Sequence, residues 1–354
     1  MLAVEVVRPG LLTTVQDLGR VGYQQFGAPT SGAMDQTALR AANLLVGNEE
    51  GAAGLEATGD GPALRALADL TVAVAGAEIE LLLDGRPIES SATMVVLRGQ
   101  LLELGRARRG LRAYLAIAGG IDVPLTLGSR STCLPAAFGG FHGRPLRQGD
   151  CLAVGPAPRR PVALTGRSLP PEWWQRAGEV LTLRVILGPQ DHRFTPEGIQ
   201  TFLTGEYRMM PETDRMGARL QGRPIAHRLG ADIISDSIPL GAVQVPADGQ
   251  PIILLADRQT TGGYTKIAVV VSEDVSRLAQ VTPGQVVRFR QVSVAEAHAG
   301  LRAYEAKFQA LQQAWQRRGE GRSYALRTGG RSYQVVVEEG IGTYTVSLEE
   351  QAQS

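Results

Sequence analysis

A lysine at the end of a polar loop is the first residue whose chemistry needs an explanation. Lys266 ends residues 257–266, DRQTTGGYTK, which follow the apolar run 252–256. Of the 36 basic side chains, 34 are arginine, and only Lys266 and Lys307 are lysine. Lysine is a compact ammonium that can lose its proton when buried, whereas arginine stays charged. Lys266 is therefore a candidate catalytic residue; the alternative is a chance lysine at a solvated loop end.

The rest of this loop carries the donors of an anion-binding pocket. The preceding apolar run predicts a strand buried on both faces, so the polar side chains emerge where it ends. Arginine and glutamine can donate to a carboxylate, phosphate or carbamate, and paired glycines let backbone N–H groups approach an anion. The alternative is a turn whose charged residues pair with neighbours to satisfy the strand end. The candidate binding residues are Asp257, Arg258, Gln259, Thr260, Gly262, Gly263 and Tyr264.

Two further turns place arginine among small polar residues. Residues 128–132, GSRST, carry Arg130, and residues 213–219, TDRMGAR, carry Asp214 and Arg215. Three such turns in a nearly neutral chain indicate an anionic ligand more strongly than any one of them.

Several motifs are absent, which argues against whole enzyme classes. The sequence contains no GxxxxGK[ST] loop, no GxGxxG after a strand, no HExxH and no GxSxG. The four histidines are far apart, and the two cysteines, Cys133 and Cys151, lack metal-ligand spacing. We therefore predict no bound metal.

The segments that must position these loops are short apolar runs between 43 glycines and 20 prolines, a pattern typical of a mainly β protein. Residues 34–45 predict a helix capped by Ser31 or Asp35. Residues 294–317 predict a long amphipathic helix packed on the second lobe, with Lys307 off its apolar stripe. Residues 324–348 predict a β-hairpin.

The length of 354 residues predicts two domains or two joined lobes. A shift toward proline and arginine over 156–171 indicates a connection. We expect a β-rich lobe over 1–160, a linker over 161–178, a second lobe with a terminal helix over 179–320, and a small β tail over 321–354.

The charge balance argues against polyanionic partners. Lys plus Arg is 36, Asp plus Glu is 35, and no basic tract exists, so we predict no nucleic-acid binding. Neither a charged leader with an apolar core nor an apolar run of about 18 residues occurs. We expect a cytoplasmic protein without membrane contact.

Five segments together resemble one family. The sequence is similar to the family of 5-oxoprolinase C subunits, also described as biotin-dependent carboxyltransferase proteins or allophanate hydrolase subunit 2. The segments that carry this resemblance are residues 8–35, 114–132, 187–194, 213–220 and 235–266.

The resemblance implies a cyclophilin-like β-barrel architecture and a role as one component of a larger assembly. Its partners would be a kinase-inhibitor-like B subunit and an A subunit, which open 5-oxoproline to L-glutamate with ATP as co-substrate. Arg130, Arg258 and Gln259 would then clamp anionic groups, Gln244 would bind the amide, and Lys266 would stabilise charge or donate a proton.

Two alternatives stay open within the same resemblance. The chain could be a carboxyltransferase component of a urea-carboxylase-like enzyme, with biotin supplied by another chain, because it has no AMKM-type carrier motif. It could also be a non-enzymatic regulator that binds a kinase-inhibitor-like partner.

Overall fold

The computed structural model describes residues 1–90, 92–157, 167–170, 173, 178, 180–318, 322–328, 331–339 and 344–351. Most of the expected linker over 161–178 lies outside these residues. Its described part contacts the first lobe, where the Thr93 backbone N–H donates to the Arg167 carbonyl oxygen at 2.9 Å.

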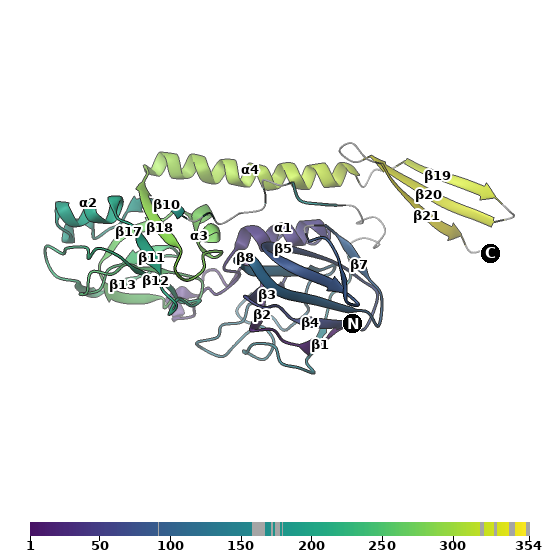
Figure 1. Cartoon of the computed structure of the whole chain (residues 1–354), viewed down its shortest axis with the longest axis horizontal. Coiled ribbons are helices and arrows are strands. Elements are labelled where there is room, and N and C mark those ends of the chain that lie inside the picture. Colours follow the sequence, from purple (N-terminus) through teal and green to yellow (C-terminus); the bar gives the residue numbers. More distant parts are fainter. Residues whose placement is uncertain are drawn as a thin grey trace.

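The first lobe is built on a sheet to which nine of the described strands belong (Figure 1). Its central path runs β2-β3-β8-β4-β1-β9, and β5 pairs along β8, β6 and β7. The strands are β1 (Leu2–Arg8), β2 (Leu12–Gln16), β3 (Gly54–Thr58), β4 (Ala63–Ala66), β5 (Leu70–Leu83), β6 (Arg86–Pro87), β7 (Met94–Val96), β8 (Leu101–Ile117) and β9 (Cys151–Ala153).

Helix α1 (Gln36–Leu45) covers one face of this sheet. Small side chains on β5 and β8, including Ala73 and Ala116, pack against α1, while Val72 and Leu115 face the other core of the lobe. Residues 70–75 are therefore buried on both faces. Asp35 accepts a hydrogen bond from the Ala38 N–H at 3.0 Å, which confirms it as the helix cap.

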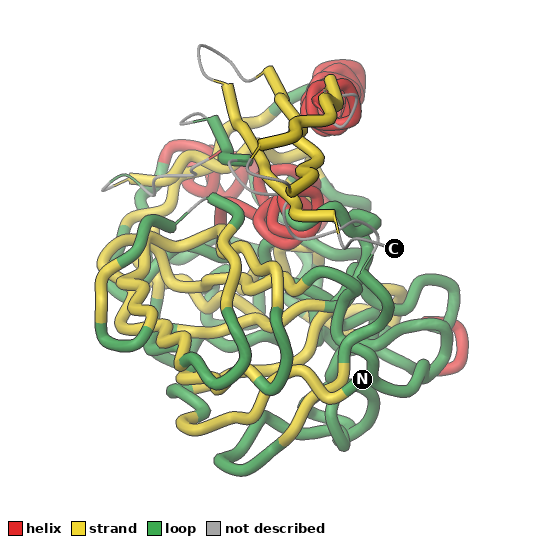
Figure 2. The backbone as a smooth tube through the Cα atoms, turned by 90° about the vertical axis from the view of Figure 1, so that its right-hand side faces the viewer, coloured by secondary structure: helices red, strands yellow, loops and turns green. Residues whose placement is uncertain are grey.

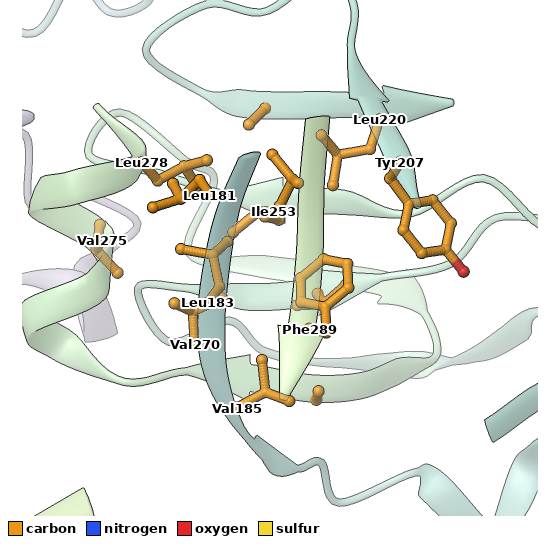
Figure 3. Packing of buried hydrophobic residues seen from close by; sticks show 14 of the residues in the cluster. Leu181, Leu183, Val185, Tyr207, Leu220, Ile253, Val270, Val275, Leu278 and Phe289 are labelled. Atoms are coloured by element: carbon orange, nitrogen blue, oxygen red, sulfur yellow. The ribbon is translucent and has the colours of Figure 1, made fainter. Parts of the chain in front are cut away.

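The second lobe is a closed barrel in the order β10-β17-β14-β15-β12-β11-β18. The parallel pairing of β18 with β10 closes it. Leu183, Val185, Ile253 and Phe289 fill its interior (Figure 3). The mainly β, two-lobed barrel architecture predicted above is confirmed. The strands are β10 (Val180–Leu187), β11 (Tyr207–Met209), β12 (Gly217–Gln221), β14 (Ala242–Gln244), β15 (Ile252–Leu254), β17 (Lys266–Val270) and β18 (Val286–Gln291).

A separate two-stranded ribbon joins β13 (Asp232–Ser237) to β16 (Thr261–Tyr264). The expectation that residues 257–266 form a loop was wrong for its second half. Thr261–Tyr264 pairs with β13, and Lys266 opens the barrel strand β17.

Two helices of the second lobe were not anticipated, α2 (Pro196–Thr204) and α3 (Ser272–Leu278). The sequence does mark the start of α2, because Thr195 is a capping residue that accepts a hydrogen bond from the Gly198 N–H and Pro196 is the first helical residue. Short 3₁₀ turns occupy Gln24–Phe26 and Asp191–Arg193. None of the described helices combines the length and apolar character needed to cross a bilayer.

The long helix α4 (Val294–Arg318) begins after β18 and crosses both lobes (Figure 1). We expected α4 to pack on the second lobe, and this expectation was wrong for most of the helix. Ala297 contacts the second lobe, while Phe308, Leu311 and Trp315 join the core around α1. The helix therefore ties the lobes together.

The tail is a three-stranded sheet of β19 (Arg322–Thr328), β20 (Arg331–Glu339) and β21 (Tyr344–Gln351). A hairpin was expected, and the structure adds β21 as a third strand paired with β20. Figure 2 shows these strands above the body of the molecule.

Candidate functional site beside the barrel

Lys266 and three polar residues form a compact group, here called the lysine cluster: Lys266, Asp236, Gln190 and Gln244. The Lys266 ammonium lies 3.0 Å from the Asp236 carboxylate. Gln190 accepts from the Lys266 backbone N–H at 3.2 Å and contacts Asp236 at 3.5 Å. Gln244 stands beside Lys266 in the β14–β17 register and donates to the Tyr264 carbonyl oxygen at 3.3 Å. One ammonium and two amides are thus gathered at one place.

The two charged side chains of the cluster differ in their exposure to solvent. Only 1% of the Lys266 side chain is exposed, whereas half of Asp236 is exposed. The hydrogen bond from Lys266, followed by that from the Ser237 backbone, lowers the pKa of Asp236. Among the described residues, Asp236 is the one hydrogen-bond partner of the Lys266 ammonium, which has three N–H donors. The spare donors can serve a carbonyl oxygen or an oxyanion.

The glycines of β16 keep this cluster compact. A Cβ on Gly262 would lie 2.6 Å from the Ile238 side chain and 3.0 Å from the Gln244 amide nitrogen. Gly262 is therefore required by close packing. Gly263 lies beside the Ile233 carbonyl oxygen on the same ribbon. Tyr264, at the end of β16, is 43% exposed.

Gln259 and Thr260 stand at the edge of this group. Gln259 is exposed, and its amide nitrogen would be 3.5 Å from a Cβ on Gly262. Thr260 accepts at its carbonyl oxygen from the Ile238 N–H at 3.0 Å. Both lie beside the ribbon, and within the described residues neither side chain makes a hydrogen bond with the Lys266 ammonium.

The Arg258 side chain makes its hydrogen bonds outside the lysine cluster. It is 4% exposed and donates to the carbonyl oxygens of Ile238 at 3.0 Å and Leu255 at 3.2 Å. Burial lowers its pKa to about 10. Within the part of the chain that the structure describes, no carboxylate pairs with it. It lines a cavity of about 180 Å³ between the lobes.

Asp257 and Arg215 form a buried ion network with the first lobe. Arg215 contacts Asp257 at 2.8 Å, donates to the Gly32 carbonyl oxygen at 2.7 Å, and pairs with Glu56 on β3. Burial favours a lower pKa for Arg215, but the two carboxylates raise it. Tyr114 also donates to Glu56 at 2.7 Å. For Asp257 the structure therefore matches the alternative of a paired strand end.

The other two predicted positions lie apart from the lysine cluster. Asp214 accepts from the backbone N–H groups of Met216 and Gly217, so it closes a turn. Arg130 donates to the Val123 carbonyl oxygen at 2.9 Å and pairs with Asp122 at 3.1 Å.

The hydroxyl groups around Arg130 are also engaged, because Ser129 and Ser131 both donate to Asp17. The expected oxyanion turn over 128–132 is thus occupied by internal contacts.

Two residues of the cluster, Asp236 and Gln190, were not predicted. Both follow or belong to polar ends of strands, so the rule that selected Arg258 could have selected them too. What hid them is that the contacts join β13, β17 and the turn after β10, which are far apart in sequence. Among the described residues, no group of histidine, cysteine, aspartate and glutamate could hold a metal ion.

A family model described as carboxyltransferase domain, subdomain A and B, matches residues 26–291. The chain belongs to this carboxyltransferase family. The resemblance stated above is confirmed. The 5-oxoprolinase C subunit of Escherichia coli is 38% identical over 318 residues, covering 90% of this chain and 99% of that protein. The C subunit of Haemophilus influenzae is 38% identical over 296 residues, covering 80% of this chain and 89% of that protein.

A solved structure extends the carboxyltransferase relationship to a larger enzyme. The urea carboxylase of Kluyveromyces lactis superimposes with a TM-score of 0.80 at 28% identity, covering 95% of this chain and 32% of that chain. This chain thus spans about a third of the yeast enzyme.

Proposed function

We propose that the chain is the C subunit of an ATP-dependent 5-oxoprolinase complex, which converts 5-oxoproline to L-glutamate together with A and B subunits. The observation that carries this proposal is the match to a 5-oxoprolinase C subunit along nearly the whole of the relative's length. Function depends on particular sites built on a fold, so the lysine cluster is the place where we expect the chemistry.

The lysine cluster supports the handling of a small cyclic amide. An ammonium with spare donors, preorganised in a buried setting, stabilises negative charge that develops on a carbonyl oxygen when the amide is attacked or phosphorylated. We assign this role to Lys266. Gln244 is placed to hydrogen-bond the amide group, and Asp236 holds the ammonium in position.

ATP binding is assigned to the partner subunits. The sequence has no phosphate-binding loop of the GxxxxGK[ST] type. We therefore propose that this chain is inactive alone and forms its complete site with the B subunit, whose docking would cover the exposed ribbon residues Tyr264 and Ile234, 43% and 94% exposed.

A second candidate is a carboxyltransferase component of a urea-carboxylase-like enzyme, which the structural match to the yeast enzyme supports. Biotin is carried on a lysine, and this chain has two lysines. Lys266 is buried in an ion pair and Lys307 lies in the middle of α4. Another chain would have to carry the biotin, and this chain would only bind and orient the acceptor.

The test is ADP release coupled to 5-oxoproline, measured with this chain alone, with the B subunit, and with the A and B subunits together. We expect 5-oxoproline-dependent release only from the complete mixture. Equal rates from the isolated chain would contradict a subunit role. No release from the complete mixture, with transfer from carboxybiotin to urea instead, would select the second candidate.

A further inference from the structure

The ribbon of β13 and β16 carries one of the charges of the lysine cluster and is only lightly attached to the molecule. None of the residues of these two strands is buried, and Ile234 is 94% exposed. Among the described strands they pair only with each other, and an irregularity between Asp232 and Asp236 interrupts their register. A segment with few buried contacts and little pairing opens at a low cost in free energy. The ribbon is therefore the part of this site that moves most easily.

Both ends of the ribbon are fixed to the second lobe. Ile238, directly after β13, is 1% exposed and belongs to a small apolar core. At the other end, the Thr265 backbone N–H donates to the Ala231 carbonyl oxygen at 2.9 Å, and both residues are buried. The Arg193 side chain also donates to the Asp232 carbonyl oxygen at 2.7 Å. The strands between these anchors can therefore bow outward without disturbing the barrel core.

Between the anchors, one ion pair and two long hydrogen bonds tie the ribbon to the rest of the site. Asp236 on β13 accepts from the Lys266 ammonium at 3.0 Å, and the Gln190 amide donates to Asp236 at 3.5 Å. Gln244 donates to the Tyr264 carbonyl oxygen at 3.3 Å. A hydrogen bond between charged groups is stronger than one between neutral groups, so the Asp236–Lys266 pair is the main tie.

The burial of Lys266 keeps a ligand away from its ammonium while the ribbon holds this position. Only 1% of the Lys266 side chain is exposed, against 50% for Asp236, so solvent reaches the carboxylate but hardly the ammonium. A charge left buried without a partner is strongly unfavourable. Asp236 can therefore leave Lys266 only when water or another negative oxygen takes its place. In the closed state its carboxylate occupies the position that an oxygen of a ligand would take.

We propose that the ribbon is a cover held shut by the Asp236–Lys266 ion pair, and that Lys266 becomes available only when the ribbon bows outward and an oxygen of a ligand replaces the Asp236 carboxylate. The exchange suits a small molecule with a carboxylate, or with a carbonyl oxygen that gains negative charge. This inference deepens the role proposed for Lys266 and rests on it for its chemical consequence. The movement itself is a property of the isolated chain.

The test uses the scarcity of lysine, since Lys266 and Lys307 are the only two in the chain. The isolated full-length chain is treated either with potassium cyanate, a small amine reagent, or with a bulky sulfonated N-hydroxysuccinimide ester. Peptide mass spectrometry follows the labelling rate at each lysine. Lys307 is exposed on α4 and is the internal reference. We expect Lys266 to react at least about tenfold more slowly than Lys307 with both reagents, because labelling requires the ribbon to open.

Asp236→Asn removes the charge that holds the ribbon shut. The buried ammonium then lacks an anion, so the open ribbon gains population, and labelling of Lys266 by the bulky ester should rise at least about tenfold relative to Lys307. Labelling by cyanate should rise less. The ratio of the two rates is decisive, because a change in the fraction of neutral amine alters both rates alike, whereas opening favours the larger reagent.

Asp232→Asn is the matched control. It makes the same change on the same strand, but the Asp232 side chain is exposed and is not the partner of the Lys266 ammonium. We expect this variant to label like the native chain. The melting temperatures of both variants are measured first, so that labelling is done well below them.

Any of three results would overturn the cover. The first is a native chain in which Lys266 is labelled as fast as Lys307. The second is an unchanged ratio of ester to cyanate labelling in Asp236→Asn, and the third is an equal rise in Asp232→Asn. Because no turnover is measured, failure here would leave the proposed role in 5-oxoprolinase untouched. A complex without 5-oxoprolinase activity would equally leave the labelling result standing.

Discussion

Asp35 is a fully buried carboxyl whose titration should be visible in the stability of the fold. Burial, as the largest influence, raises its pKa to about 6 despite hydrogen bonds from Gln280 and Ala38. Below the ordinary value of 3.8, the carboxyl is protonated in both the folded and the unfolded chain. Between 3.8 and about 6 the unfolded chain releases the proton first, so the folded state loses stability as pH rises.

This predicts that the stability of the native chain relative to Asp35→Asn falls by up to about 3 kcal/mol between pH 4 and pH 7. Urea unfolding at intervals of one pH unit measures it. Asp150→Asn is the control, because Arg144 lowers the pKa of Asp150 from its ordinary value of 3.8, so its contribution is lost only as pH falls below that value and should stay nearly constant between pH 4 and pH 7. A pH-independent difference for Asp35→Asn would show that its carboxyl does not titrate in this range.

Lys266 allows a prediction about activity. In the assembled complex, Lys266→Arg should lower kcat/KM at least tenfold, about 1.4 kcal/mol, because the larger planar fork cannot reproduce a buried ammonium. The buried position also predicts a stability loss of about 1–3 kcal/mol from overpacking. Activity is therefore measured well below the melting temperature of the variant.

Lys307→Arg is the matched control, since Lys307 is exposed on α4. It should leave activity unchanged and stability within about 0.5 kcal/mol. Equal tolerance at both positions would remove Lys266 from the chemistry and shift the site to the neighbouring amides.

At the scale of elements, α4 depends on one aromatic contact group. Phe308 stacks edge to face with Trp173 at 4.8 Å and with Tyr304 at 5.1 Å, and the Arg40 guanidinium lies 3.7 Å from its ring centre. Phe308→Ala should therefore reduce the free energy of unfolding by about 3–5 kcal/mol.

Urea unfolding of Phe308→Ala beside Leu301→Ala checks this prediction. Leu301 belongs to the same sequence stripe but is 38% exposed, so its loss should cost less than about 1 kcal/mol. Similar costs at both positions would mean that α4 does not hold the lobes through its second half.

The sequence predicts α1 and α4 well because their signals are local. Asp35 caps one helix, and a sustained apolar stripe marks the other. The surface that α4 covers was mispredicted, since periodicity shows which face is apolar but not what lies opposite. The ribbon strand Thr261–Tyr264 was missed because glycine-rich residues disfavour strands, and here pairing with β13 decides.

At the scale of the whole molecule, Arg215 joins the lobes by pairing with Glu56 of the first lobe, while Asp257 of its own lobe also pairs with it. Arg215→Met removes the ion-pair partner of the buried Glu56 and Asp257 carboxylates, so we expect a loss of about 3–5 kcal/mol in stability. The exposed pair of Arg8 and Asp60 is the control, and Arg8→Met should cost no more than about 1 kcal/mol.

Thermal and urea unfolding measure both variants, and limited proteolysis adds a second readout. If the lobes separate in Arg215→Met, the connection around 161–178 should be cleaved faster than in Arg8→Met. Equal stability of the two variants would mean that apolar contacts alone hold the lobes together.

The candidate site was only partly predictable, because some of its features are local in sequence and others depend on residues far apart in the chain. Its polar residues follow strands, a local pattern that points to Lys266 and Gln244. The partners of these side chains come from β13, β17 and the turn after β10, which are far apart in sequence, and elsewhere in the molecule from the other lobe. Arg215 pairs with Glu56, which precedes it by 159 positions, and no spacing rule reaches that far.

Helix α4 also fixes a distance. With 25 residues at about 1.5 Å each, the helix is roughly 37 Å long and separates the last barrel strand from the tail sheet by that length. Because its second half is fastened to the first lobe, the tail is displayed at a set reach from the barrel. A partner that contacts both the tail and the ribbon over the lysine cluster must be long enough to span that distance. Shortening α4 by whole turns would change the size of partner that can contact both.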